Sequence, residues 1–183
     1  MNLFQEMLPV ATIMPSVKKY SFWLAVFLCI TAVSCTNMEC PLGNMVQVKC
    51  GIYGSDGKEL TFTDTMTVRA AGTDQLLLNR AFSIKSFSVP LAYEAGVDTL
   101  LICLSDSKDR VAVDTLFVSH ESSPHFESVD CPIVFFHNIR EVSSANDVKS
   151  DFPIIIDHVE LSRSLVNYDS DENIKLYLRS VSD

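Results

Sequence analysis

The sequence predicts an all-β protein, an immunoglobulin-like antiparallel β-sandwich that follows an N-terminal lipoprotein signal peptide. Two observations predict the sandwich. After residue 45, short apolar stretches recur between turn residues, and several of them alternate apolar with polar residues as half-buried strands do. No segment after residue 34 carries the period of a sustained helix. A third observation, an apolar run near the N-terminus, predicts the signal peptide.

The N-terminal apolar run covers residues 22–33 and has the layout of a secretory signal. Lys18 and Lys19 precede it, and Cys35 follows it. The run is shorter than the roughly 20 residues of a membrane-spanning helix, so we expect export rather than a permanent span. Residues 31–35 resemble a bacterial lipobox, in which the cysteine becomes the acylated first residue. An ordinary signal-peptidase site at the same place is the alternative.

Cleavage before Cys35 would divide the chain into three segments. These are a signal peptide over residues 1–34, a lipidated tether over 35–44 and a sandwich domain over 45–183. Glu6 lengthens the signal beyond its usual form, whereas a start at Met14 gives a regular one, so we predict Met14 as the true start. Lipoprotein processing adds at least two acyl chains, which is enough for stable anchoring. The predicted partner is therefore the membrane, through lipid on Cys35.

The composition of the segment after the signal excludes some classes of binding partner. Residues 35–183 make 149 residues, a length that suits one domain with a real core. This segment has 12 basic and 22 acidic residues, a formal net charge of −10. Without a basic cluster to meet phosphate, nucleic acid is excluded as a partner and anionic head groups are disfavoured.

Four cysteines remain for pairing once Cys35 carries lipid. They are Cys40, Cys50, Cys103 and Cys131, and an even number in an exported chain indicates disulfides with three possible connectivities. Cys50 and Cys103 each lie in a strand-like stretch, which suits two strands facing one core. We therefore favour Cys50 with Cys103 and Cys40 with Cys131. The spacing lacks any CxxC pair, so we expect no metal site.

The strands are predicted in order from alternation and from turns. Residues 46–52 alternate, and the Asp56-Gly57 turn then leads into a second alternating stretch through residue 70. Gly72-Thr73-Asp74 marks the next turn, and residues 143–151 are polar and predict a loop. Phenylalanines in the apolar stretches are assigned to the core: Phe82, Phe87, Phe117, Phe135, Phe136 and Phe152. The further strands are predicted at 76–78, 82–84, 87–91, 99–104, 111–118, 133–136, 154–156 and 174–178.

No motif for catalysis or cofactor binding is present. The four histidines after the signal lie outside recognisable motifs, and there is no Gly-x-Ser-x-Gly, phosphate-binding glycine loop or His-Glu-x-x-His. We therefore predict a non-catalytic protein without a cofactor. Residues 167–171 begin like a calcium loop, but Glu172 stands where the loop needs glycine and Leu178 where it needs glutamate. An Asx-rich turn between two strands is the better interpretation.

Three short triplets predict O-glycosylation. Thr65, Thr99 and Thr115 each stand between an aspartate and an apolar residue, Met or Leu. This pattern resembles the modification signal of exported Bacteroidetes proteins. Each match alone is weak, and the three together make these threonines candidate sites.

The last third of the chain carries a resemblance to a family. Residues 131–139 (CPIVFFHNI), 156–161 (IDHVEL), 166–169 (VNYD) and 172–177 (ENIKLY) resemble an uncharacterised family of small Bacteroidales lipoproteins. Where that family tends to have Cys-Gly, this chain has Cys131-Pro132. The resemblance implies that the protein is located in the cell envelope, and it supports pairing Cys40 with Cys131. It implies no known activity or ligand.

These observations lead to one functional prediction and one alternative. We predict a non-catalytic lipoprotein of the outer membrane, an accessory or interaction module that contacts another envelope protein such as an integral barrel. The residues after Cys35 do not match an acidic surface-export signal, so the periplasmic face is favoured. The alternative is a carbohydrate- or peptide-binding lipoprotein module, with Tyr53, Tyr93, Tyr168 and Tyr177 as possible contacts.

Overall fold

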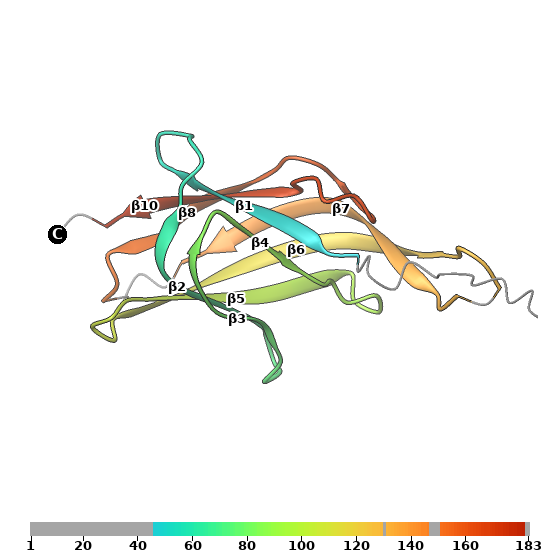
Figure 1. Ribbon diagram of the computed structural model, residues 1–183, viewed down its shortest axis with the longest axis horizontal. Coiled ribbons are helices and arrows are strands. Elements are labelled where there is room, and N and C mark those ends of the chain that lie inside the picture. Colours follow the sequence, from blue (N-terminus) through green and yellow to red (C-terminus); the bar gives the residue numbers. More distant parts are fainter. Residues whose placement is uncertain (1–45, 130, 147–150, 182–183) are drawn as a thin grey trace, which may run out of the picture. The chain divides into compact units, whose positions relative to one another are not determined.

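The computed structural model describes residues 46–129, 131–146 and 151–181, and this part of the chain is a two-sheet β-sandwich (Figure 1). The predicted signal, the tether with Cys35 and Cys40, and Met14 lie outside the described residues. The strands are β1 (Val48–Gly54), β2 (Phe62–Ala70), β3 (Leu76–Ile84), β4 (Ser86–Val89), β5 (Val97–Ser105), β6 (Val111–His125), β7 (Val134–Ala145), β8 (Ile154–Leu161), β9 (Leu165–Val166) and β10 (Ile174–Ser180).

The two sheets are built from strands that are distant in sequence. The smaller sheet has the order β4-β1-β10-β8, and the larger has the order β3-β2-β5-β6-β7-β9. All pairings are antiparallel except β1 with β10, which run parallel with Cys50 opposite Ile174. A parallel pair needs a long connection, and the first and last strands of the domain have one. The predicted all-β sandwich is therefore confirmed, with one parallel pair in it.

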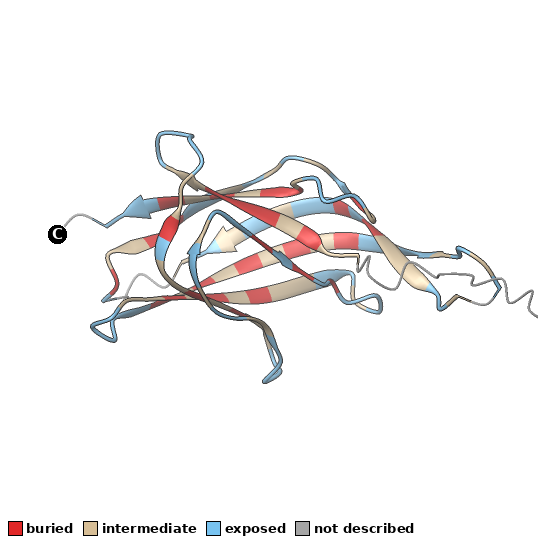
Figure 2. Ribbon diagram, in the orientation of Figure 1, coloured by how far each residue is buried: buried red, intermediate tan, exposed pale blue. Residues whose placement is uncertain are grey.

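The core lies between the sheets, where the apolar inner side chains of both sheets meet. Along the strands, buried residues alternate with less buried ones (Figure 2). Along β5, Leu100, Ile102 and Leu104 are buried while the residues between them are half-buried. Phe62 and Phe152 meet edge to face at 6.4 Å between ring centroids. Phe87 and Phe152 are buried as predicted, whereas Phe82 is 68% exposed and corrects that assignment. The other three phenylalanines assigned to the core are half-buried and outside the core cluster: Phe117, Phe135 and Phe136.

Phe82 is exposed because it lies on β3, an irregular edge strand. The register of β3 against β2 shifts three times, and Arg80 and Ser83 have positive φ angles of 47° and 55°. Such irregularities turn side chains out of the alternating pattern and protect a sheet edge from further pairing. Another departure is the loop predicted over 143–151, since β7 continues through Ala145.

Two buried polar side chains link the sheets. Asp114 on β6 is fully buried, and its carboxylate accepts a hydrogen bond from the backbone N–H of Ile156 on β8 at 2.7 Å. Asn173, 3% exposed, precedes β10 and bonds backbone groups of Lys49, Arg163 and Leu165. A buried polar group is tolerated where its hydrogen bonds are made, so both residues fix how the sheets meet.

Candidate functional site

The outer face of the four-stranded sheet carries a row of three aromatic rings, Tyr53, Tyr177 and His158. They are adjacent because Tyr53 pairs with Tyr177 across β1 and β10, and Tyr177 pairs with His158 across β10 and β8. The ring centroids of Tyr53 and Tyr177 are 5.5 Å apart, and those of Tyr177 and His158 are 4.3 Å apart and nearly parallel at 9°. We call these three residues the ring row.

The rings of the ring row lie against one another, so the flat faces of Tyr177 are covered. Both tyrosine hydroxyls donate to carboxylates, Tyr53 to Glu172 at 3.0 Å and Tyr177 to Glu160 at 2.9 Å. Partial desolvation raises the pKa of Tyr53 to about 12, and the neighbouring Glu172 carboxylate adds a smaller effect in the same direction. Both hydroxyls therefore stay protonated and oriented at neutral pH.

Gly51 makes room for the carboxylate beside the ring row. A Cβ atom at Gly51 would lie 1.8 Å from Oε2 of Glu172 and 2.9 Å from Cε2 of Tyr53. Glycine inside a strand weakens it and often marks a close approach of another group to the backbone. The Glu172 side chain makes that approach here.

A hollow of about 230 Å³ lies next to Gly51. It is lined by Lys49, Ile52, Tyr53, Glu59, Lys85, Ser86 and Glu172. The ammonium of Lys175 lies 5.4 Å above the centre of the Tyr53 ring. Tyrosine is enriched at protein interfaces, and the charged groups around this hollow suit a polar side chain of a partner.

A second polar cluster, Asp98, His120, Ser122 and His137, lies at the inner face of the six-stranded sheet. Nε2 of His120 contacts Asp98 at 2.9 Å, and the Nδ1 atoms of His120 and His137 are 3.3 Å apart. The Ser122 hydroxyl lies 3.1 Å from Nδ1 of His137. The residue types match those of a hydrolytic triad, and sequence patterns did not reveal them.

The histidine cluster lacks the exposure that a nucleophilic site needs. His120 and His137 are 2% and 4% exposed. Burial lowers the pKa of His137 to about 4, and His120 adds a smaller effect in the same direction. Asp98 opposes both with a weaker effect. Nδ1 of His137 has one site for either a proton or a lone pair, and it already faces both His120 and Ser122. The arrangement therefore suits a buried polar network better than proton transfer to a substrate.

The predicted disulfide between Cys50 and Cys103 is wrong, because both are free thiols. Cys50 is fully buried on β1, and its side chain points into the core. Cys103 lies at an outward position of β5, opposite Thr67 and Val113. The two thiols belong to different sheets and point in different directions. Burial raises the pKa of the Cys50 thiol to about 12, which leaves it inert.

The remaining cysteine predictions concern the N-terminal segment. Cys131 is disulfide-bonded, and the Ser128 hydroxyl donates to its Sγ at 3.3 Å. Cys40, its predicted partner, and Cys35, the predicted lipid site, lie outside the described residues. Both assignments stay predictions.

The three threonines predicted to carry glycans all lie on the six-stranded sheet. Thr65, Thr99 and Thr115 occupy half-buried outward positions of β2, β5 and β6. Their preceding aspartates point the other way, and two of them have structural partners in His120 and in the Ile156 backbone. The triplet thus has a structural explanation as well, and modification stays a prediction.

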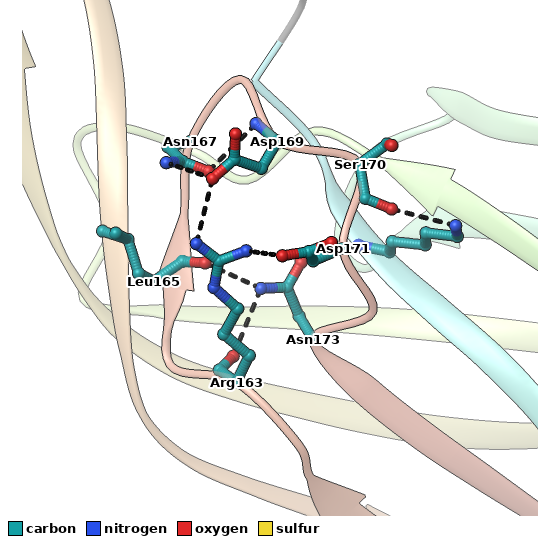
Figure 3. A network of polar contacts seen from close by, with 8 residues as sticks. Arg163, Leu165, Asn167, Asp169, Ser170, Asp171 and Asn173 are labelled. Carbon is teal, nitrogen blue, oxygen red and sulfur yellow. Dashed lines mark hydrogen bonds and ion pairs between the residues drawn. The ribbon is translucent and has the colours of Figure 1, made fainter.

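The loop before β10 confirms the Asx turn that the sequence favours (Figure 3). The Asn167 carboxamide oxygen accepts the backbone N–H of Asp169 at 3.0 Å. The Arg163 guanidinium lies between Asp169 and Asp171 and pairs with both carboxylates. Arg163 thus pairs with one oxygen of each of the two carboxylates that the calcium interpretation required.

No group of three or more metal-binding side chains gathers within the described residues. Over the same ranges, no helix has the length and apolar character to cross a membrane.

Comparison with known proteins gives one match. The model of a family of unknown function, DUF6452, matches residues 65–178, which is more than half of the chain. Neither the curated proteins nor the solved structures provide a match. The matched region runs from β2 to β10 and so includes most of both sheets and of the ring row. The chain therefore belongs to the DUF6452 family.

Proposed function

We propose that the protein is a non-catalytic lipoprotein of the outer membrane, held by lipid on Cys35 at the periplasmic face, and that its sandwich binds another envelope protein. The observation that carries the binding role is the ring row with the adjacent hollow. This surface combines tyrosine hydroxyls of fixed orientation, carboxylates and lysines. Such groups give a protein interface its directional contacts.

A protein partner fits this surface better than a carbohydrate. Sugar rings stack on open aromatic faces, but in the ring row Tyr177 lies between Tyr53 and His158. The groups left open are ring edges and charges, which pair with complementary polar groups of a partner. The non-catalytic proposal is supported by the burial of His120 and His137.

The test places a photo-crosslinking amino acid at His158 in the full chain, in its native cells. We expect one integral envelope protein to be captured, and Glu172→Lys to abolish the capture by reversing a charge of the hollow. The matched control carries the crosslinker at Phe82, an exposed aromatic position of the other sheet. Equal capture from both positions would exclude the ring row as the binding surface.

A separate measurement tests the anchor. Labelled palmitate should be incorporated by the wild-type chain and lost in Cys35→Ser. Lipid-free wild-type protein would refute the lipoprotein assignment and leave the binding surface to be judged by crosslinking.

A further inference from the structure

An apolar patch lies at the turn between β6 and β7. Phe126, Val129 and Ile133 are 64%, 102% and 51% exposed. They account for three of the ten large apolar side chains that are exposed within the described residues. We call these three residues the hairpin tip. Three large apolar side chains exposed within eight residues of one turn are candidates for a contact with a partner or a membrane.

The hairpin that carries the tip extends past the neighbouring strands at one end of the domain (Figure 1). β6 and β7 pair as far as His125 with Val134, well beyond the last pairing of β6 with β5 at Ser119. The start of β1, where the chain enters the sandwich, lies at the same end in this view. The tip and the N-terminal entry therefore face in one direction.

Aromatic contacts support the base of the tip. The ring of His125 stacks on Phe136 at 4.2 Å between centroids, and Tyr168 meets Phe136 edge on at 5.2 Å. Within the turn, the Cys131 backbone N–H donates to the Ser128 carbonyl at 3.3 Å. A preformed turn loses little conformational entropy when its apolar side chains are buried.

We propose that the hairpin tip inserts its three apolar side chains into the interface of the bilayer that holds the lipid anchor. This inference rests on the lipoprotein assignment made above. Cys131, within the turn, is disulfide-bonded, and the two other described cysteines are free. With Cys40 as its partner, the bond would lie five positions along the chain from the predicted lipid site, Cys35. Five chain steps span at most about 18 Å, which sets the upper limit on the distance between the anchor and the bonded turn.

The charge around the tip favours a membrane with neutral head groups. The sequence of the turn contributes two acidic residues, Glu127 and Asp130, and Glu127 pairs with His125 at 3.1 Å. No arginine or lysine lies between His125 and Arg140. The tip therefore lacks the cations that bind anionic lipid, and its attraction to a bilayer is hydrophobic.

The experiment uses a single tryptophan as the depth probe. The only tryptophan in the sequence, Trp23, is removed with the predicted signal. Phe126→Trp then gives the processed protein one indole at the tip, and Phe82→Trp provides the matched control on an edge strand. Each protein is reconstituted into vesicles of phosphatidylethanolamine and phosphatidylcholine that contain brominated acyl chains.

We expect bromine to quench Phe126→Trp at least about threefold more strongly than Phe82→Trp, with a blue-shifted emission. Equal quenching and water-like emission from both would overturn the proposal. The intact mass of the same samples reports acylation, so failure of the anchor is seen separately. Quenching that survives without acylation would still support the tip contact. Quenching of Phe126→Trp that appears only when an envelope protein is added would assign the tip to a protein partner instead.

Discussion

The buried side chain of Asn173 gives the sharpest test of how the domain is held together. Its Oδ1 accepts the backbone N–H of Lys49 at 3.1 Å, and its Nδ2 donates to the carbonyls of Arg163 and Leu165 at 3.2 and 2.9 Å. Asn173→Ala removes all three bonds and leaves the backbone groups partly shielded from water. Each bond contributes about 1 kcal/mol net, and an unpaired buried group costs more. We expect a loss of about 3 kcal/mol.

The assay is urea unfolding of the chain from residue 35 with Cys35→Ser, followed by tyrosine fluorescence. With a slope near 2 kcal/mol per M, a loss of about 3 kcal/mol lowers the midpoint by roughly 1.5 M. The matched control is Asn167→Ala, which removes two solvent-exposed hydrogen bonds in a turn and should cost less than about 1 kcal/mol. If Asn173→Ala is no more destabilising than this control, the assigned role of Asn173 is wrong.

Three further predictions follow from single residues. Folding lowers the pKa of His137 from 6.5 to about 4, so the stability that its neutral form gives above pH 6.5 is lost as the pH falls toward 4. The free energy of unfolding at pH 5 should therefore be up to about 2 kcal/mol lower than at pH 7.5. If the same difference persists in His137→Phe, the assignment is wrong. Cys103, half-buried and outward, should be alkylated in the native protein while Cys50 reacts only after denaturation; mass mapping with iodoacetamide checks this, and equal labelling would contradict the placement. Gly51→Ala should push the flexible Glu172 carboxylate aside and so reduce crosslinking from the ring row. The free energy of unfolding should change by less than about 1 kcal/mol. Unchanged crosslinking would show that this carboxylate is dispensable for partner binding.

The strands with one buried face could be predicted from the sequence. In β1, β2, β5 and β10, most inward residues are apolar because the sandwich buries one side of each strand, with Asp64 and Asp98 as the polar exceptions. β9 was missed because a two-residue strand has no period to read. The extension of β7 over residues 143–145 was missed because its side chains are small or polar, and β6 provides the pairing partners.

The candidate site could not be predicted, because it depends on register between distant strands. Tyr53 and Tyr177 become neighbours only through the parallel pairing of β1 with β10. The two histidines meet only because β6 and β7 pair with a shift between Ser119 and His120. The Cys50–Cys103 prediction failed for a related reason, since both lie in apolar strands but only one points inward. Alternation alone did not decide whether the Cys103 side chain points into the core or away from it.

The parallel pairing of β1 with β10 also bears on when the protein can fold. The middle of the four-stranded sheet joins the first strand of the domain to the last. β1 can therefore pair at Cys50 only after Ile174 of β10 has been synthesised. Contacts this distant in sequence make folding slow, on the order of milliseconds to seconds for small β proteins. A nascent chain of this kind stays unfolded until its C-terminal strand emerges.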